Sequence, residues 1–211
     1  SIFAGVAADA EVQFCLAQRT PSGAATTGIN RLNQGQASWT MNQIESSLKP
    51  STIWDRNKYL NVWTVIFGGS DAGTLGYAQF PGGSASTDGV VLLYSSVGSV
   101  ATPNPAGGVY GRGRTATHEV GHWLNLRHIW GDATCGNDLV SDTPVHNTAN
   151  YGCPAYPHYS TCSGTPVEMT MNYMDYTDDA CMYMFSAGQK SRMQALFATG
   201  GSRASLATSD G

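Results

Sequence analysis

The sequence of 211 residues carries little charge and has no long hydrophobic run. Only 12% of the residues are charged, and the formal net charge is −4. Nucleic acids attract basic surfaces, so this charge balance predicts no nucleic-acid partner. No apolar run approaches the roughly 20 residues that a membrane-spanning helix requires, and Ser1 does not begin a signal-peptide pattern. We therefore expect no membrane span, and we expect this chain to be a trimmed mature form.

Internal repeats and low-complexity segments are also absent. Hydrophobic residues make up 41% of the chain, which is typical of a folded globule and excludes a disordered tail. A chain of this length can form one sizeable core, or one domain that a cleft divides into two lobes. We expect a single domain over residues 1–211.

The sequence contains no CxxC pair, although it has five cysteines. Such pairs are the commonest signature of cysteine-rich zinc sites, so their absence favours disulfides and leaves a structural zinc site as the alternative. Four cysteines lie in the irregular stretch 131–180 or just beyond it: Cys135, Cys153, Cys162 and Cys181. Two disulfides would imply an oxidising compartment, and therefore export. The fifth cysteine, Cys15, is expected to be a buried thiol on a strand.

Regular structure is expected in the first 125 residues and again near the end of the chain. Short runs that alternate or are rich in β-branched residues predict strands at 11–17, 60–67, 75–80 and 89–95. Apolar residues at helical spacing predict helices over about 37–48 and 112–125, and Pro50 is expected to end the first. A capping box formed by Ser186 and Gln189 predicts a third helix that closes the chain.

The strongest functional pattern lies in the second predicted helix, where the sequence reads HEVGH from His118 to His122. Residues four apart share one face of a helix, so both imidazoles can bind one metal ion. The carboxylate of Glu119 can reach an attacking water without being a ligand, as a general base should. Two surface histidines on an exposed helix are the alternative interpretation.

His128 provides a third candidate ligand, which matters because catalytic zinc usually takes three protein ligands and a water. If the helix continued, His128 would lie about 240° around the axis from His122, and the two could not share an ion. The helix must therefore end between them. Asn125 lies where this turn is needed, and asparagine tolerates a left-handed backbone better than other non-glycine residues.

These residues resemble the zinc motif HExxHxxGxxH of the metzincin peptidases, here HEVGHWLNLRH with Asn125 at the usual glycine. The segment 172–176 (NYMDY) is similar to the methionine turn of one metzincin family, the pappalysins. The resemblance extends to the strand segments LGYAQFP and GVVLLYSSVG, the cysteine spacing and the closing CMYMFSAGQKSRM, so it covers nearly the whole chain.

The resemblance implies an α+β, metzincin-like catalytic domain. Its upper lobe, about residues 1–128, would contain a twisted, mainly parallel sheet, two helices and the zinc motif. Its lower lobe, about residues 129–211, would be irregular, contain the methionine turn and end in a helix. The family pattern would link this lower lobe by two disulfides, Cys135–Cys162 and Cys153–Cys181.

The same resemblance implies a secreted zinc-dependent endopeptidase that acts on protein or peptide substrates. Glu119 would be the general base, Met174 the apolar floor beneath the zinc, and the Tyr176 hydroxyl a stabiliser of the tetrahedral intermediate. Without the zinc motif, a core methionine and a packed tyrosine would be the ordinary interpretations. The family also allows an inhibitory pro-segment, which would lie outside this chain.

Substrate specificity is expected to depend on Asp179, which the resemblance places at the bottom of the pocket for the residue after the scissile bond. An acidic floor favours a basic guest, so we expect cleavage before Arg, with Lys as the second choice. A solvated carboxylate beside Asp178 is the alternative. Strand 89–95 would be the sheet edge that pairs with an extended substrate.

Calcium is a second expected ion. The loop 138–143 offers oxygen donors of the kind that calcium prefers, namely Asp138, Asp142 and Thr143, and pappalysins bind calcium near this place. An acidic turn is the alternative. The two remaining histidines, His146 and His158, are interpreted as surface or loop residues.

Two other functions could use the same zinc motif. One is a zinc-binding but non-catalytic protease-like module, and the other is a zinc hydrolase of small amides or esters. Structural zinc sites fill all four positions with protein ligands, whereas three histidines and an intact Glu119 leave one position open. The sequence therefore favours an enzyme.

Overall fold

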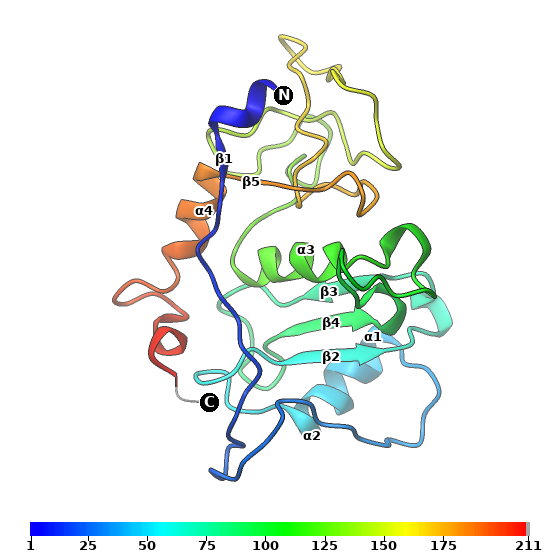
Figure 1. The fold of residues 1–211 in the computed structure, drawn as a ribbon, viewed down its shortest axis with the longest axis vertical. Helices are drawn as coiled ribbons and strands as arrows, with labels where there is room; N and C mark the ends of the chain where they lie inside the picture. The colour runs from blue at the N-terminus through cyan, green and yellow to red at the C-terminus, as the bar shows by residue number, and fades with distance from the viewer. Residues whose placement is uncertain (210–211) are drawn as a thin grey trace.

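The computed structural model describes residues 1–209, and its centre is a three-stranded sheet (Figure 1). The strands are β2 (Val62–Val65), β3 (Gly76–Ala78) and β4 (Val90–Leu93), in the order β2-β4-β3. β2 is parallel to β4, and β3 is antiparallel to it. All three lie within predicted strands. The strand predicted at 89–95 is, however, the central strand and not an edge, so that prediction was wrong, and β3 is the free edge on the antiparallel side.

Helices cover both faces of this sheet. Successive side chains of β4 point to opposite faces, so both faces present apolar residues that the helices bury. Val90 and Leu92 pack in one core with Trp123 of helix α3 (Arg114–Trp123), whereas Val91 packs in a second core with Ile44 and Leu48. Figure 1 shows α3 on one side of the strands and the α1–α2 region on the other.

The first helical region begins and ends about four residues later than predicted. It consists of α1 (Met41–Gln43), a π-helical turn η2 (Ile44–Leu48) and α2 (Lys49–Thr52), and Thr40 forms a capping box with Gln43 at its start. Pro50 was expected to end the helix, but it lies in the first turn of α2. Proline has no N–H and clashes with the carbonyl four residues earlier in an α-helix, and the wider π turn before it accommodates this.

The strand predicted at residues 11–17 is not formed. Strand β1 (Ala7–Ala8) precedes it and pairs antiparallel with β5 (Phe185–Ser186). Residues 11–17 have no sheet partner, and Phe14 and Leu16 are exposed. Cys15 is exposed too, which corrects the expectation of a buried thiol. Alternation gives a strand only where a sheet edge is available to pair with it.

Residues 124–184 are irregular, as predicted for the stretch 131–180, and most of them lie above the sheet in Figure 1. They contain the two predicted disulfides, Cys135–Cys162 and Cys153–Cys181. The chain then enters α4 (Ala187–Gln194), where the predicted capping box between Ser186 and Gln189 is present. Buried methionines of this part, Met169, Met171 and Met174, join the core that contains Trp123. The α+β class is confirmed.

The remaining elements are short 3-10 helices. They are η1 (Ile2–Gly5), η3 (Gly69–Asp71), η4 (Tyr94–Ser96), η5 (Gly108–Tyr110) and η6 (Ala204–Thr208). Within residues 1–209, no helix has both the length and the apolar character needed to cross a bilayer.

Candidate metal centre and active site

Helix α3 carries His118, Glu119 and His122 on its buried side, and it ends where the metal geometry requires. Its last residue is Trp123, and Asn125 follows with φ +72°, in the left-handed region. The Asn125 N–H donates to the His122 carbonyl at 2.8 Å, and the Leu126 N–H donates to the Gly121 carbonyl at 2.9 Å. This turn confirms the role predicted for Asn125 and lets the chain bring His128 back toward the helix.

The three histidines converge, with ligand atoms that all lie within 4.8 Å of one another. Each Nδ1 faces an acceptor: the Tyr173 carbonyl at 2.7 Å for His118, the Leu126 carbonyl at 2.8 Å for His122, and the Asp132 carboxylate for His128. These acceptors place the proton on Nδ1, so each Nε2 keeps a lone pair for a metal.

The Nε2 atoms of His122 and His128 lie 3.1 Å apart. Because both rings carry their proton on Nδ1, two lone pairs face each other, which is favourable only around a cation. Zinc–nitrogen bonds of about 2.0–2.1 Å in a tetrahedral site give a similar spacing between ligand atoms. The donor set and the spacing between His122 and His128 therefore fit zinc.

Burial sets the charge of the groups around this centre. It lowers the pKa of His122 to about 4 and holds the pKa of His118 well below its usual range, with the neighbouring histidines adding to both shifts. The neutral imidazole is the form that binds a metal. Burial also raises the pKa of the Glu119 carboxyl to about 8. The carboxylate of Glu119 is thus a stronger base than that of an exposed glutamate, and a cation bound nearby would favour its ionised form.

Met174 lies against helix α3, and Tyr176 lies beside His128. Met174 is fully buried, and a Cβ added to Gly121 of α3 would meet its Sδ at 2.5 Å. Tyr176 is 37% exposed, and its hydroxyl lies 3.0 Å from His128 Nε2. Burial raises the pKa of Tyr176 to about 12, so its hydroxyl remains a proton donor at neutral pH.

Two neighbours of His128 were missed in the sequence. Asp132 contacts its Nδ1, and the ring of Trp130 stacks on it with centroids 4.3 Å apart and an interplanar angle of 7°. Both lie within four residues of His128. An acidic residue four positions after a candidate ligand is the sequence signal that could have identified Asp132. A third missed residue is Phe80, two residues after the end of β3, whose ring centroid lies 5.2 Å from that of His122.

Asp179 is buried and connects two segments around the site. Its Oδ2 accepts the backbone N–H of Arg112 at 2.8 Å and of Arg114 at 3.2 Å, just before and at the start of α3. Burial raises the pKa of its carboxyl, and the two amide hydrogen bonds oppose this shift. The carboxylate is thus held beside the first turn of α3.

The three expected calcium ligands are not brought together. Asp138 is buried and accepts the Thr143 hydroxyl at 2.8 Å through Oδ2. The carboxylate of Asp142 points elsewhere, because it accepts the Ser186 hydroxyl at 2.6 Å and the Gly188 N–H at 2.8 Å at the start of α4. Among the described residues, only the three histidines form a cluster of His, Cys, Asp or Glu close enough to hold a metal.

His146 lies in a loop, one of the two predicted alternatives, but it is fully buried and not on the surface. Its Nε2 accepts the Met169 N–H at 2.9 Å, and its Nδ1 faces the carboxylates of Glu168 and Asp175. His158 is partly exposed and lies 3.6 Å from Glu168. A histidine outside any motif carries no sequence signal for such a buried cluster.

Comparisons with known proteins agree with this geometry. The sequence model of the peptidase M43 family, described as pregnancy-associated plasma protein-A, matches residues 36–198. The structure of mature mirolysin from Tannerella forsythia, in complex with a cleaved peptide, superposes with a TM-score of 0.87 and is 42% identical. That match covers 98% of this chain and 78% of mirolysin.

Two curated relatives are named extracellular metalloproteases. One, from Pyricularia oryzae, is 35% identical over 181 residues, and the other, from Coccidioides posadasii, is 39% identical over 167 residues. These matches cover 82% and 76% of this chain, but 62% and 57% of the relatives. The chain therefore spans about three-fifths of the length of the curated relatives that it matches.

Proposed function

This chain belongs to the pregnancy-associated plasma protein-A family of peptidases, the pappalysins, and we propose that it is a zinc-dependent endopeptidase with one catalytic domain. The observation that carries the proposal is the convergence of three histidine ligand atoms beside a buried glutamate that is not part of the histidine cluster. A structural zinc site would use a fourth protein ligand and would have no need of that glutamate.

Zinc held by His118, His122 and His128 would supply a Lewis acid that activates water and polarises the scissile carbonyl. Glu119 accepts the proton of the attacking water and passes it to the leaving amine. The Tyr176 hydroxyl donates a hydrogen bond to the developing oxyanion, a contribution that is typically worth about 3 kcal/mol. Met174 closes the apolar floor under the histidines.

Substrate would bind as an extended peptide along β3. This strand pairs with β4 on one side only, so its other edge can accept a peptide strand by main-chain hydrogen bonds. The ring of Phe80 follows β3 and borders His122, which places an apolar wall next to the reacting centre.

For specificity, we propose cleavage before Arg, with Lys second, because Asp179 offers a buried carboxylate beside the start of α3. Its Oδ2 already accepts two amide hydrogen bonds, so Oδ1 is the atom expected to meet the guest cation. Peptide profiling of wild type and Asp179→Asn tests this. A loss of kcat/KM confined to basic guests supports the pocket, whereas an equal loss for all guests indicates a structural role.

Secretion is supported by the two disulfides and by the extracellular relatives. Calcium remains a proposal that rests on Asp138, a buried carboxylate whose pKa burial raises. A bound calcium ion would offset that burial, so adding a calcium-selective chelator should lower the melting temperature. If the temperature does not move, the acidic-turn interpretation replaces the calcium site.

The central test is digestion of casein, an unstructured substrate, with and without a zinc chelator, followed by mass spectrometry of the products. We expect chelator-sensitive cuts that are restored by added zinc. Glu119→Gln should retain zinc, measured by elemental analysis, and lose turnover. A wild-type protein that holds zinc but makes no cuts would instead be the non-catalytic module.

A further inference from the structure

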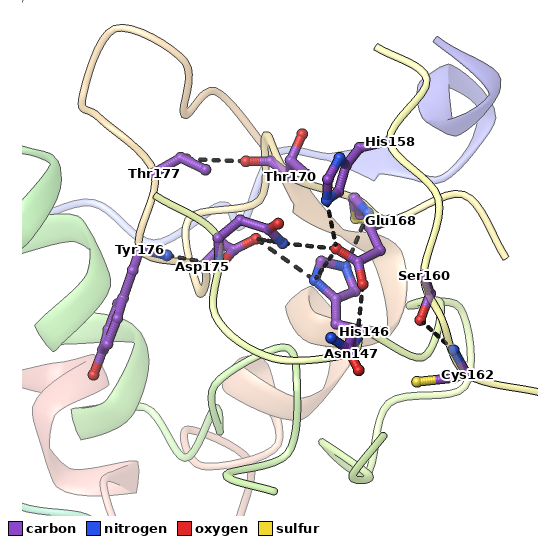
Figure 2. A network of polar contacts seen from close by, with 12 residues as sticks. His146, Asn147, His158, Ser160, Cys162, Glu168, Thr170, Asp175, Tyr176 and Thr177 are labelled. Carbon is purple, nitrogen blue, oxygen red and sulfur yellow. Dashed lines mark hydrogen bonds and ion pairs between the residues drawn. The ribbon is translucent and has the colours of Figure 1, made fainter. Parts of the chain in front are cut away.

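A buried polar cluster lies directly behind Tyr176, and the mechanism above does not use it (Figure 2). It contains the carboxylates of Glu168 and Asp175, which are 1% and 0% exposed. The side-chain amide of Asn150 joins them, since Nδ2 donates to Glu168 Oε2 at 2.8 Å and to Asp175 Oδ2 at 3.0 Å. Burying two carboxylates is unfavourable unless hydrogen-bond donors surround them, so the positions of these donors fix the positions of the two carboxylates.

Asp175 also binds the backbone of Tyr176. Its Oδ1 accepts the Tyr176 N–H at 2.9 Å and the Asn150 N–H at 2.8 Å. Asn150 therefore donates hydrogen bonds to the Asp175 carboxylate from both its backbone and its side chain. The backbone from which the Tyr176 ring projects is fixed by the same carboxylate, as Figure 2 shows.

The other side of the cluster is closed by a histidine. Because His146 Nε2 accepts the Met169 N–H, its proton lies on Nδ1, which faces Asp175 Oδ2 at 3.5 Å and Glu168 Oε2 at 3.9 Å. His146 Nδ1 is buried and makes no hydrogen bond at these distances, so the hydrogen-bond donors of the 146–150 loop are Asn147 and Asn150. A shift of this loop would break the contacts of Asn150 with Asp175.

Tyr176 needs such an anchor because its ring is partly exposed. Its ring centroid lies 4.9 Å from that of His128, 4.8 Å from that of Trp130 and 5.9 Å from that of the exposed Tyr151. A hydroxyl that stabilises a transition state must be held within about 0.5 Å of its productive position by the groups behind it. Tyr151 follows Asn150 directly in the chain, so both aromatic residues adjoin backbone that the Asp175 carboxylate holds.

We propose that Asn150, acting through Asp175, is a positioning residue for the Tyr176 hydroxyl. This inference rests on the proposed endopeptidase function. It predicts that removing the Asn150 amide lowers kcat only as far as Tyr176 contributes to it.

The test is a double-mutant cycle with Asn150→Ala and Tyr176→Phe, measured as kcat and KM on one peptide that the wild type cleaves. We expect Tyr176→Phe to lower kcat about 100-fold, as loss of an oxyanion donor does. Asn150→Ala should lower kcat roughly tenfold and leave KM within about twofold of the wild-type value. When it is introduced into the Tyr176→Phe variant, it should lower kcat by less than about a further twofold.

The matched control is Asn147→Ala, in the same loop. The Asn147 side chain accepts the Thr161 hydroxyl at 2.8 Å, and its contact with Glu168 is made by the backbone N–H, which alanine keeps. Its kcat should stay within about twofold of wild type. Zinc content and the urea midpoint of every variant separate a loss of positioning from a loss of fold. If Asn150→Ala does not fold, Asn150→Ser, which retains one donor, takes its place in the cycle.

An unchanged kcat in Asn150→Ala, or losses that multiply with that of Tyr176→Phe, would overturn the positioning role and leave the endopeptidase proposal intact. A wild type that holds zinc and cleaves nothing would instead refute the endopeptidase proposal itself.

Discussion

At the scale of single residues, Asp132 controls the orientation of a metal ligand. It accepts from His128 Nδ1, and it lies in the left-handed region with φ +61°. Asp132→Asn keeps the side-chain size and tolerates this backbone, but it removes the negative charge behind the ligand. We expect zinc affinity to fall roughly tenfold, the lower end of what loss of such a partner causes. Competition with a coloured zinc chelator measures it, and Asp9→Asn, at an exposed N-terminal site, serves as the control.

Gly121 is the residue at which helix α3 touches the methionine below it. An added Cβ would meet Met174 Sδ at 2.5 Å, closer than carbon and sulfur atoms pack. Gly121→Ala should therefore lower the free energy of unfolding by about 1–3 kcal/mol, the usual effect of overpacking a core. Urea denaturation measures this change. Gly5→Ala is the matched control because a Cβ there meets nothing within 4 Å; equal stabilities of the two variants would contradict the close contact.

At the scale of elements, the end of α3 determines whether three histidines can meet. Asn125 adopts φ +72°, where a residue with a Cβ and no helpful side chain is strained by roughly 1–2 kcal/mol. Asn125→Ala should lose about that much stability, whereas Asn125→Gly should stay close to wild type. Thermal unfolding of both variants measures the difference. An alanine variant as stable as the glycine variant would show that the turn carries no strain.

Local patterns in the sequence predicted those elements whose signals are local. The helix with HEVGH, the turn at Asn125 and the cap at Ser186 depend on residues that are neighbours in the chain, and all three are present. The strand at residues 11–17 failed because a strand also needs a partner that its own sequence does not specify. The edge of the sheet was misassigned for the same reason, since the order β2-β4-β3 is a long-range property.

In the candidate site, too, the residues linked by local sequence signals were predicted and those linked by long-range contacts were not. The three histidines and Glu119 follow from spacing along one helix and the turn after it, and Met174 and Tyr176 came from family resemblance. The cluster behind Tyr176 was not predicted, because Asn150, Glu168 and Asp175 meet across up to 25 residues of irregular chain. No periodicity connects residues in such a segment, so their contacts are visible only once the chain is folded.

At the scale of the whole molecule, one arginine ties the end of the chain to the sheet region and the metal-binding helix. Arg203 is buried and pairs with Asp88 through two hydrogen bonds, of 2.9 and 3.1 Å. Its Nε donates to the Trp123 carbonyl at 2.9 Å, and its guanidinium lies 3.5 Å from the Trp123 ring centroid. These contacts join segments 80 and 115 residues apart in the chain.

Breaking this pair should destabilise the whole fold, because it leaves a buried carboxylate without its cation. We expect Arg203→Met to lower the free energy of unfolding by about 3–5 kcal/mol, while Arg31→Met, at an exposed site, should change it by less than about 0.5 kcal/mol. The double variant Asp88→Asn with Arg203→Met should recover part of the loss, since no unpaired charge remains. Urea denaturation of the four proteins, wild type included, measures these differences. If the double variant were no more stable than Arg203→Met alone, the loss would come from packing on Trp123 and not from the stranded charge of Asp88.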